Sequence, residues 1–108
     1  KNRVGYNDNS QKTILDIGCG SGLLSLELAH QTYALVAGID LSPDMIKLAN
    51  NNLKRKIREI EDRIIEDYKE GGCDFTSVAP SIAFRFSEEI EEVTQAFTDR
   101  VKFFQGNV

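Results

Sequence analysis

The stretch 13-TILDIGCGSG-22 decides the fold of this chain. Its first five residues are mostly apolar and partly β-branched, which is typical of a buried strand, and its last five contain Gly18, Gly20 and Gly22. Residues 23–29 (LLSLELA) are good helix formers with apolar positions three and four apart. The sequence therefore predicts a strand, a tight glycine loop and a helix that begins directly at the loop.

A second strand and a second helix follow. Residues 34–40 (ALVAGID) form another short apolar run and complete a βαβ unit. Ser42 is a good N-cap, and Pro43 suits the first position of a helix. Apolar residues then recur every three or four positions from 46 to 68, and the Gly71-Gly72 pair predicts the stop. The helix either runs unbroken or breaks near the asparagines 50–52, because asparagine is a weak helix former.

The segment 53–100 is predicted to be an insertion. Residues 73–86 show no period apart from the alternation of Ile82 and the phenylalanines after it, and Ser87 is predicted to cap a later helix. Residues 101–105 (VKFFQ) predict a third strand. Four aromatic residues at strand spacing are expected in the core: Phe84, Phe86, Phe103 and Phe104.

Composition limits the classes of protein that fit. The chain has 108 residues, 41% of them hydrophobic, and a net charge of -4, which allows one domain and argues against a stand-alone nucleic-acid binder. No apolar run is long enough for a membrane span, and the polar start does not resemble a signal peptide. Cys19 and Cys73 have no metal-ligand spacing. We therefore expect no metal site, no membrane and an intracellular location, cytoplasmic or nuclear.

The predicted elements together form a site for an adenosine-containing cofactor. A glycine loop after one strand and Asp40 at the tip of the next are the arrangement in which a carboxylate accepts hydrogen bonds from ribose hydroxyls. The glycines let the loop bring its N–H groups against a ligand. Asp16, two residues before Gly18, would repel a pyrophosphate but would attract the ammonium and sulfonium of S-adenosyl-L-methionine. This electrostatic argument favours S-adenosylmethionine over nicotinamide and flavin dinucleotides.

The motifs 14-ILDIGCGSG-22 and 38-GIDLS-42, followed by Met45, resemble those of class I S-adenosylmethionine-dependent methyltransferases. The resemblance implies an α/β, Rossmann-like doubly wound parallel sheet. Residues 1–108 would supply an incomplete, partial domain, with about three of the strands. The resemblance places the first motif around the methionine part of the cofactor, Asp40 on the ribose and Met45 near the adenine. Asn107 stands where the family has an acidic residue that contacts the adenine amino group. The candidate cofactor-binding residues are Asp16, Gly18, Cys19, Gly20, Gly22, Asp40, Leu41, Met45 and Asn107.

The resemblance also implies what is missing. In the family order the third and second strands lie outside the first, so right-handed crossovers place both connecting helices on one face and leave the other face bare. The loops that bind the methyl acceptor follow later strands of the family fold. We therefore predict no catalytic residue and expect a missing C-terminal half or a partner chain.

The acceptor is not identified, and RNA is one candidate. The long link and the 101-VKFFQGN-107 ending are similar to those of enzymes that methylate RNA 5′-phosphates. Those enzymes carry asparagine where Gly20 stands and an aromatic residue after the Gly-Asn pair, and this chain has neither. Alternatives to a methyltransferase are a non-catalytic module that binds an adenosine cofactor and a NAD-dependent oxidoreductase domain.

Other polar residues are predicted to have structural roles. His30 is expected to complement the negative end of a helix dipole, and Cys19 to be a small residue in a crowded turn. Basic residues between 54 and 63 could contact RNA. Acidic residues three and four positions away favour instead a solvated helix face with opposite-charge pairs. The basic residues are Lys54, Arg55, Lys56, Arg58 and Arg63, and the acidic ones Glu59, Glu61, Asp62 and Glu66.

Overall fold

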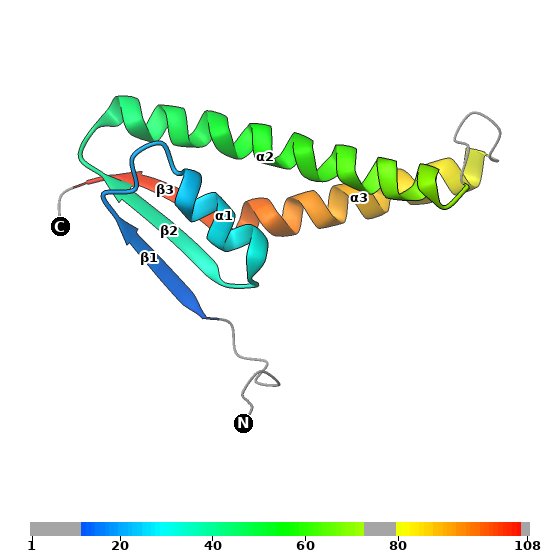
Figure 1. Ribbon diagram of the computed structural model, residues 1–108, viewed down its shortest axis with the longest axis horizontal. Helices are drawn as coiled ribbons and strands as arrows, with labels where there is room; N and C mark the ends of the chain where they lie inside the picture. Colours follow the sequence, from blue (N-terminus) through cyan, green and yellow to red (C-terminus); the bar gives the residue numbers. More distant parts are fainter. Residues whose placement is uncertain (1–11, 73–79, 107–108) are drawn as a thin grey trace, which may run out of the picture.

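The computed structural model describes residues 12–72 and 80–106 and shows a three-stranded sheet with a long helical hairpin (Figure 1). The strands are parallel, in the order β1-β2-β3, so the third and second strands lie outside the first as predicted. The prediction of an incomplete Rossmann-like α/β fold is confirmed. The elements are β1 (Thr13–Ile17), α1 (Leu23–Gln31), β2 (Leu35–Asp40), α2 (Pro43–Glu70), α3 (Pro80–Arg100) and β3 (Val101–Gln105).

The core lies on one face of the sheet. Ile14, Val36 and Val101 form a row across the three strands and pack beneath the helices, where Leu26 of α1 and Phe97 of α3 close the cluster. Alternate residues of a strand point to opposite faces, so the helices bury only half of each strand. The predicted placement of both crossovers on one side is correct.

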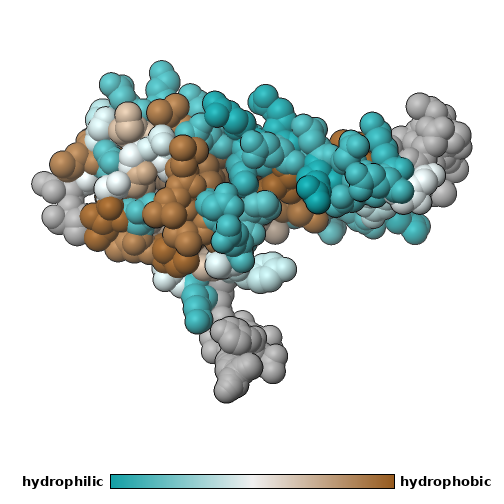
Figure 2. All heavy atoms as spheres, in the orientation of Figure 1, coloured by the Kyte–Doolittle hydropathy of each residue, from teal (hydrophilic) through white to brown (hydrophobic). Residues whose placement is uncertain are grey.

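The opposite face of the sheet is bare in the described part of the chain. Its apolar side chains are exposed by 54% at Leu15, 58% at Ile17, 39% at Leu35 and 53% at Phe104. Figure 2 shows apolar side chains gathered over the sheet end of the molecule, whereas the helical hairpin is mostly hydrophilic. Parallel sheets normally have both faces covered, so these residues mark a surface suited to burial.

Helix α2 runs unbroken from Pro43 to Glu70, which decides between the two predicted alternatives. The Ser42 hydroxyl caps it by accepting from the Met45 N–H at 3.2 Å, and the chain leaves the helix at Gly71, as predicted. The asparagine run does not interrupt it. Asn52 is 7% exposed and its amide has a partner outside the helix, so its weak helix propensity is offset by a tertiary contact.

Helix α3 begins at Pro80, earlier than predicted, and packs along α2. The alternation at 82–86 is therefore not strand structure, and Ser87 lies inside the helix instead of capping it. Phe86 meets the Tyr68 ring edge-on at 4.6 Å between centroids. Phe84 is 67% exposed, so the core prediction was wrong for this residue and for Phe104, while Phe103 packs against the core. The competing signal was the helical period, which the alternation of Ile82, Phe84 and Phe86 obscured.

Arg100 ties the end of α1 to the end of α3. Its Nη1 donates to the carbonyl oxygens of Ala29, Thr32 and Ala34 at 3.0, 3.2 and 3.0 Å. The guanidinium also lies 5.4 Å from the centre of the Phe97 ring. The helix C-terminus is thus satisfied by a cation from a distant segment, as its dipole favours. His30 lies in the same last turn of α1.

Candidate cofactor site

The glycine loop between β1 and α1 is fastened to the neighbouring strand. The N–H groups of Gly18 and Cys19 both donate to the Ile39 carbonyl, at 2.7 and 2.9 Å. Gly18 and Gly20 have φ angles of 73° and 56°, a left-handed region that only glycine adopts readily. A Cβ atom at either position would meet nothing within 4 Å, so open space lies beside both residues.

Asp40 bridges two loops. Its Oδ2 accepts from the Gly20 N–H and its Oδ1 from the Ser42 N–H, both at 2.9 Å. These two hydrogen bonds lower the pKa of Asp40, and the one from Ser42 has the larger effect. The carboxylate is therefore ionised at neutral pH. The Gly20 N–H was expected to face a ligand and instead faces this side chain. Each carboxylate oxygen has a second acceptor position, which leaves the group able to receive ribose hydroxyls.

Asp16 also has a partner within the chain. Its Oδ2 accepts from the hydroxyl of Ser25 at 2.6 Å, and Ser25 is fully buried on α1. This hydrogen bond connects β1 to α1, where Ser25 lies on the buried side with Leu26 and Ala29. The sequence signal for the contact is a serine among the apolar residues of the helix.

Cys19 lies between the two carboxylates. Burial, followed by the charges of Asp16 and Asp40, raises the pKa of its thiol. The side chain therefore stays protonated at neutral pH, which suits a small filler in a crowded turn and not a nucleophile. Both acids therefore lie close enough to the loop to act on a charge bound there.

Gly22 and Gly38 have a packing role. A Cβ atom on Gly22 would lie 2.7 Å from Cζ of Phe103, and one on Gly38 would lie 2.7 Å from Cδ1 of the same ring. Phe103 thus fills the space beneath the loop that the two glycines leave. The place of Gly22 in the motif predicts a contact with the ligand, whereas the contact with the third strand follows from no sequence pattern.

The remaining candidates lie where the strands end. Met45 is 36% and Leu41 64% exposed, so both apolar side chains are accessible beside Asp40. The end of β3 reaches the same place, because the Gly106 N–H donates to the Asp40 carbonyl at 3.0 Å. Asn107 lies outside the described residues.

Asn52 also contacts the glycine loop, and no sequence pattern predicts this role. Its Nδ2 donates to the Ser21 carbonyl at 2.9 Å and so connects the glycine loop to α2. The side chain is buried, and no periodic pattern distinguishes it from its neighbours Asn50 and Asn51. Its role depends on how two distant segments pack.

We expect Asn52→Ala to destabilise the protein by about 1–3 kcal/mol, because the substitution leaves a buried carbonyl without its donor. Urea denaturation measures the loss. The exposed neighbour provides the control: Asn51→Ala should change the free energy of unfolding by less than about 0.5 kcal/mol. Equal effects would mean that the Ser21 contact contributes nothing.

The comparison with protein families decides the class. A family profile described as "Methyltransferase domain" matches residues 14–103. The chain belongs to this family. The methyltransferase resemblance drawn from the two motifs is therefore confirmed, and the methyl donor of the family is S-adenosylmethionine.

Curated relatives of this methyltransferase domain agree. The ribosomal protein L11 methyltransferase of Leptospira interrogans is 36% identical over 76 residues, which cover 70% of this chain and 24% of the relative. The ubiquinone biosynthesis O-methyltransferase of Nitrosomonas europaea is 41% identical over 56 residues, covering 52% and 23%. An uncharacterized methyltransferase of Schizosaccharomyces pombe is 54% identical over 43 residues, covering 40% and 16%. The aligned part of the chain thus spans less than a quarter of each.

A solved structure is also similar to the methyltransferase domain. The rRNA methyltransferase aviRa from Streptomyces viridochromogenes is 23% identical, with a TM-score of 0.41, and the match covers 92% of this chain and 41% of that one.

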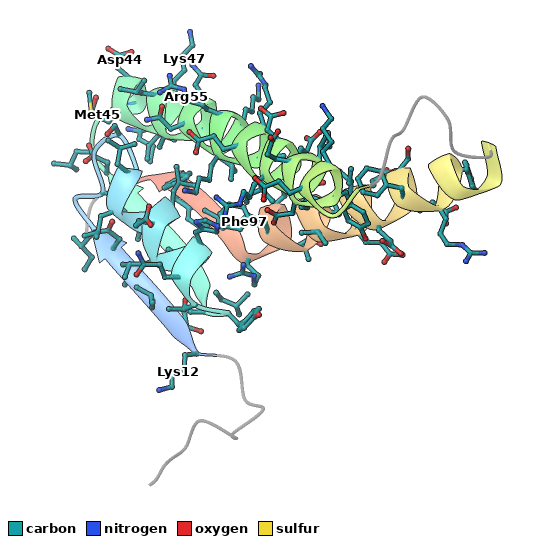
Figure 3. The ribbon with its side chains drawn as sticks, turned by 45° about the vertical axis from the view of Figure 1, so that its right-hand side comes forward. Lys12, Asp44, Met45, Lys47, Arg55 and Phe97 are labelled. Atoms are coloured by element: carbon teal, nitrogen blue, oxygen red, sulfur yellow. The ribbon has the colours of Figure 1, made fainter. Side chains whose placement is uncertain are left out.

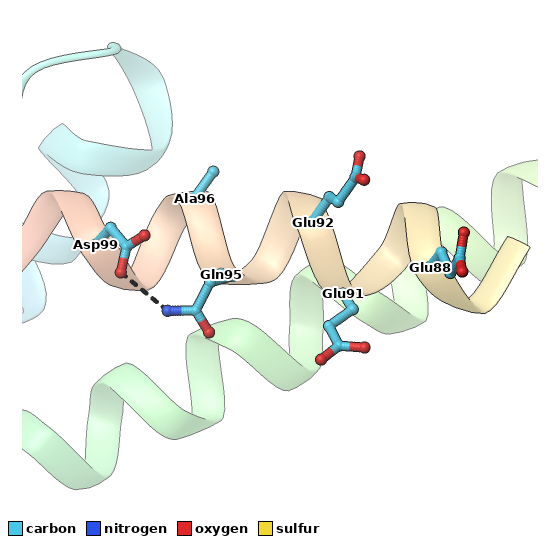
Figure 4. A pocket seen from close by; sticks show the side chains of 6 residues that line it. All are labelled: Glu88, Glu91, Glu92, Gln95, Ala96 and Asp99. Atoms are coloured by element: carbon cyan, nitrogen blue, oxygen red, sulfur yellow. Dashed lines mark hydrogen bonds between the residues drawn. The ribbon is translucent and has the colours of Figure 1, made fainter. Parts of the chain in front are cut away.

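The charged residues of the domain lie mainly on the helical hairpin. Lys56 pairs with Glu27 and Glu59 at 3.7 and 3.8 Å, and Arg63 pairs with Asp67 at 3.2 Å. Within residues 12–72 and 80–106 these are the ion pairs of α2. The sequence predicted opposite-charge pairs along the helix between residues 54 and 66, and only some of those charged residues form pairs. A shallow cavity of about 570 Å³ runs along α3 and is lined largely by acids (Figure 4). It lies on α3 and not at the glycine loop.

Among the residues that the structure describes, no group of three or more His, Cys, Asp or Glu side chains is arranged to hold a metal ion. None of the helices in residues 12–72 and 80–106 is long and apolar enough to cross a membrane.

Proposed function

We propose that this methyltransferase domain binds S-adenosylmethionine at the carboxyl ends of β1 and β2 and presents it for methyl transfer. The observation that carries the proposal is the pair of carboxylates, Asp16 and Asp40, on either side of a loop with open space at Gly18 and Gly20. A cationic donor is attracted to these carboxylates. Asp40 would accept the ribose hydroxyls through its unused lone pairs, with Leu41 and Met45 beside the adenine and Asn107 near its edge.

The same features argue against a dinucleotide. A pyrophosphate needs free N–H groups at the loop, yet those of Gly18, Cys19, Gly20 and Gly22 donate within the chain. The two carboxylates would repel it as well. This is why the oxidoreductase alternative is less well supported than the methyltransferase.

We also propose that residues 1–108 are part of a larger catalytic unit, with the segment 53–100 as an insertion. The exposed apolar residues on the bare face of the sheet support a further layer of structure there. The layer would be a C-terminal half or a partner chain, and it would supply the acceptor pocket and any catalytic residues. If it did not, the domain would be the non-catalytic module considered above. We place the protein inside the cell, in the cytoplasm or nucleus, because Cys19 is a free thiol.

Calorimetric titration tests the cofactor assignment. We expect S-adenosylhomocysteine, which lacks the transferred methyl group and the sulfonium charge but keeps the ammonium and the ribose, to bind the protein, and NAD to show no measurable heat. The two compounds share an adenosine, so the comparison shows whether the site prefers a ligand that carries an amino acid group or one that carries a pyrophosphate. Binding of NAD alone would refute the proposal.

A further inference from the structure

The outer face of helix α2 is unusually basic over its first half. Residues 45–58 contain no Asp or Glu but five basic residues, and four of these are exposed. The fifth, Lys56, is turned toward α1, where it pairs with Glu27, and it also pairs with Glu59 on α2. We name the exposed set the basic stripe, which consists of Lys47, Lys54, Arg55 and Arg58.

The spacing of the basic stripe places its members on one side of the helix. Positions 47, 54 and 58 lie seven and four residues apart, so they share a face opposite to the buried Ala49 and Asn52. Arg55 lies at the edge of this face, where it also borders a groove against α1 that Glu27 and Glu59 line. In Figure 3 Lys47 projects away from the ribbon near the start of α2.

The basic stripe has no ion-pair partner in residues 12–72 and 80–106, where the pairs involve Lys56 and Arg63 only. Asp44 and Asp62 stand at its two ends. The acids of α2 lie before and after the basic stripe, at Asp44 and from Glu59 onward, and Figure 4 shows further acids along α3: Glu88, Glu91, Glu92 and Asp99. The net charge of -4 therefore conceals a local run of positive charge in the first half of α2.

We propose that the basic stripe contacts the phosphate backbone of a nucleic acid. Arginine and lysine at regular intervals suit a linear array of phosphates, which arginine can bind through two N–H groups at once. The exposed apolar side chain that borders the stripe is Leu48, seven residues before Arg55, and a single leucine is less than the apolar core of a protein interface. The stripe contains no aromatic ring on which a base could stack, so we expect contacts that do not depend on sequence.

The position of the basic stripe relates it to the cofactor site. Helix α2 begins three residues after Asp40, and Lys47 lies in its second turn. A strand held along the stripe would pass beside the carboxyl ends of β1 and β2. The inference rests on the proposed methyltransferase function for its purpose, since it makes a nucleic acid the class of acceptor, but the binding itself can be measured without methyl transfer.

Fluorescence anisotropy on the full chain tests the proposal. The probes are a labelled oligouridine and an oligothymidine of about 15 nucleotides, with salt varied from about 50 to 200 mM. The variant replaces all members of the basic stripe: Lys47→Gln, Lys54→Gln, Arg55→Gln and Arg58→Gln. We expect it to lower affinity about tenfold or more at 0.1 M salt, and to flatten the dependence of log K on log salt by about 3.

A control removes the same charge elsewhere, through Arg63→Gln, Lys69→Gln, Arg85→Gln and Lys102→Gln. It should weaken binding by less than about threefold, because screening limits the effect of distant charges at this salt concentration. Preference for oligouridine or oligothymidine identifies RNA or DNA as the source of the phosphates. Equal losses in the two variants, no binding of either strand, or equally tight binding of polyglutamate would overturn the proposal. Titration with S-adenosylhomocysteine in the same variants tests the cofactor site separately.

Discussion

Asp40→Ala is expected to weaken the binding of S-adenosylhomocysteine by about 10- to 150-fold, because the carboxylate would hold both ribose hydroxyls through charge-assisted hydrogen bonds. The same substitution frees the Gly20 and Ser42 N–H groups, which the carboxylate fixes at 2.9 Å in the structure. Part of the loss will therefore come from a less ordered loop. Calorimetric titration gives the affinity, and circular dichroism during thermal unfolding shows how far the loop change affects stability.

A matched control separates the ribose contact from general electrostatics. Asp44 is an exposed carboxylate in the first turn of α2, four residues further along the chain. Asp44→Ala removes the same charge and should change the affinity less than about twofold, since exposed charges are largely screened. If both variants lose affinity equally, or if Asp40→Ala loses none, the assignment of Asp40 to the ribose is wrong.

Gly22→Ala is expected to destabilise the protein by about 2–5 kcal/mol. Gly22 has a φ angle of 79°, where an alanine costs about 1–2 kcal/mol. The new Cβ would also approach the Phe103 ring to 2.7 Å and the Ala49 Cβ to 3.0 Å, and such overpacking costs about 1–3 kcal/mol more. Urea denaturation measures the change in the free energy of unfolding, which is a large fraction of the stability of an ordinary domain.

Gly20→Ala distinguishes packing from backbone strain. Gly20 also has a positive φ, but an added Cβ there meets nothing within 4 Å. Its loss of stability should therefore be limited to about 1–2 kcal/mol. In the Gly22→Ala background, Phe103→Leu should cost less than it does in the wild type, because it removes the ring that is in conflict. Additive costs, or equal losses in the two glycine variants, would show that Phe103 does not press on the loop.

The linear pattern of the chain was sufficient to predict the βαβ unit, the start of α2 at Ser42 and the third strand. Each depends on neighbours in sequence: an apolar run, a cap or a period. The early start of α3 was missed for the same reason. Phe84 and Phe86 alternate like strand residues. In the structure they lie on a helix, and this places Phe86 in contact with Tyr68 on α2. Only a distant partner could decide between the two periods.

The candidate site also contains residues that the sequence predicts and contacts that it does not. Asp16, Asp40 and the glycines are predicted cofactor residues because the prediction depends on residue types at fixed places around the ends of two strands. The partners of these residues could not be predicted, because Ser25, Asn52 and Phe103 reach the loop from three different elements. Packing also decided where the loop N–H groups point, since the Gly20 N–H donates to Asp40, twenty residues away.

Sequence by itself determined the family, the order of strands and helices, and the two carboxylates at the strand ends, because short-range periodicity and loop chemistry are written in adjacent residues. The tertiary structure alone decided that α2 stays whole and that Phe103 fills the space under Gly22 and Gly38. Those outcomes depend on contacts between residues far apart in the chain, and these are set by how the elements pack in three dimensions.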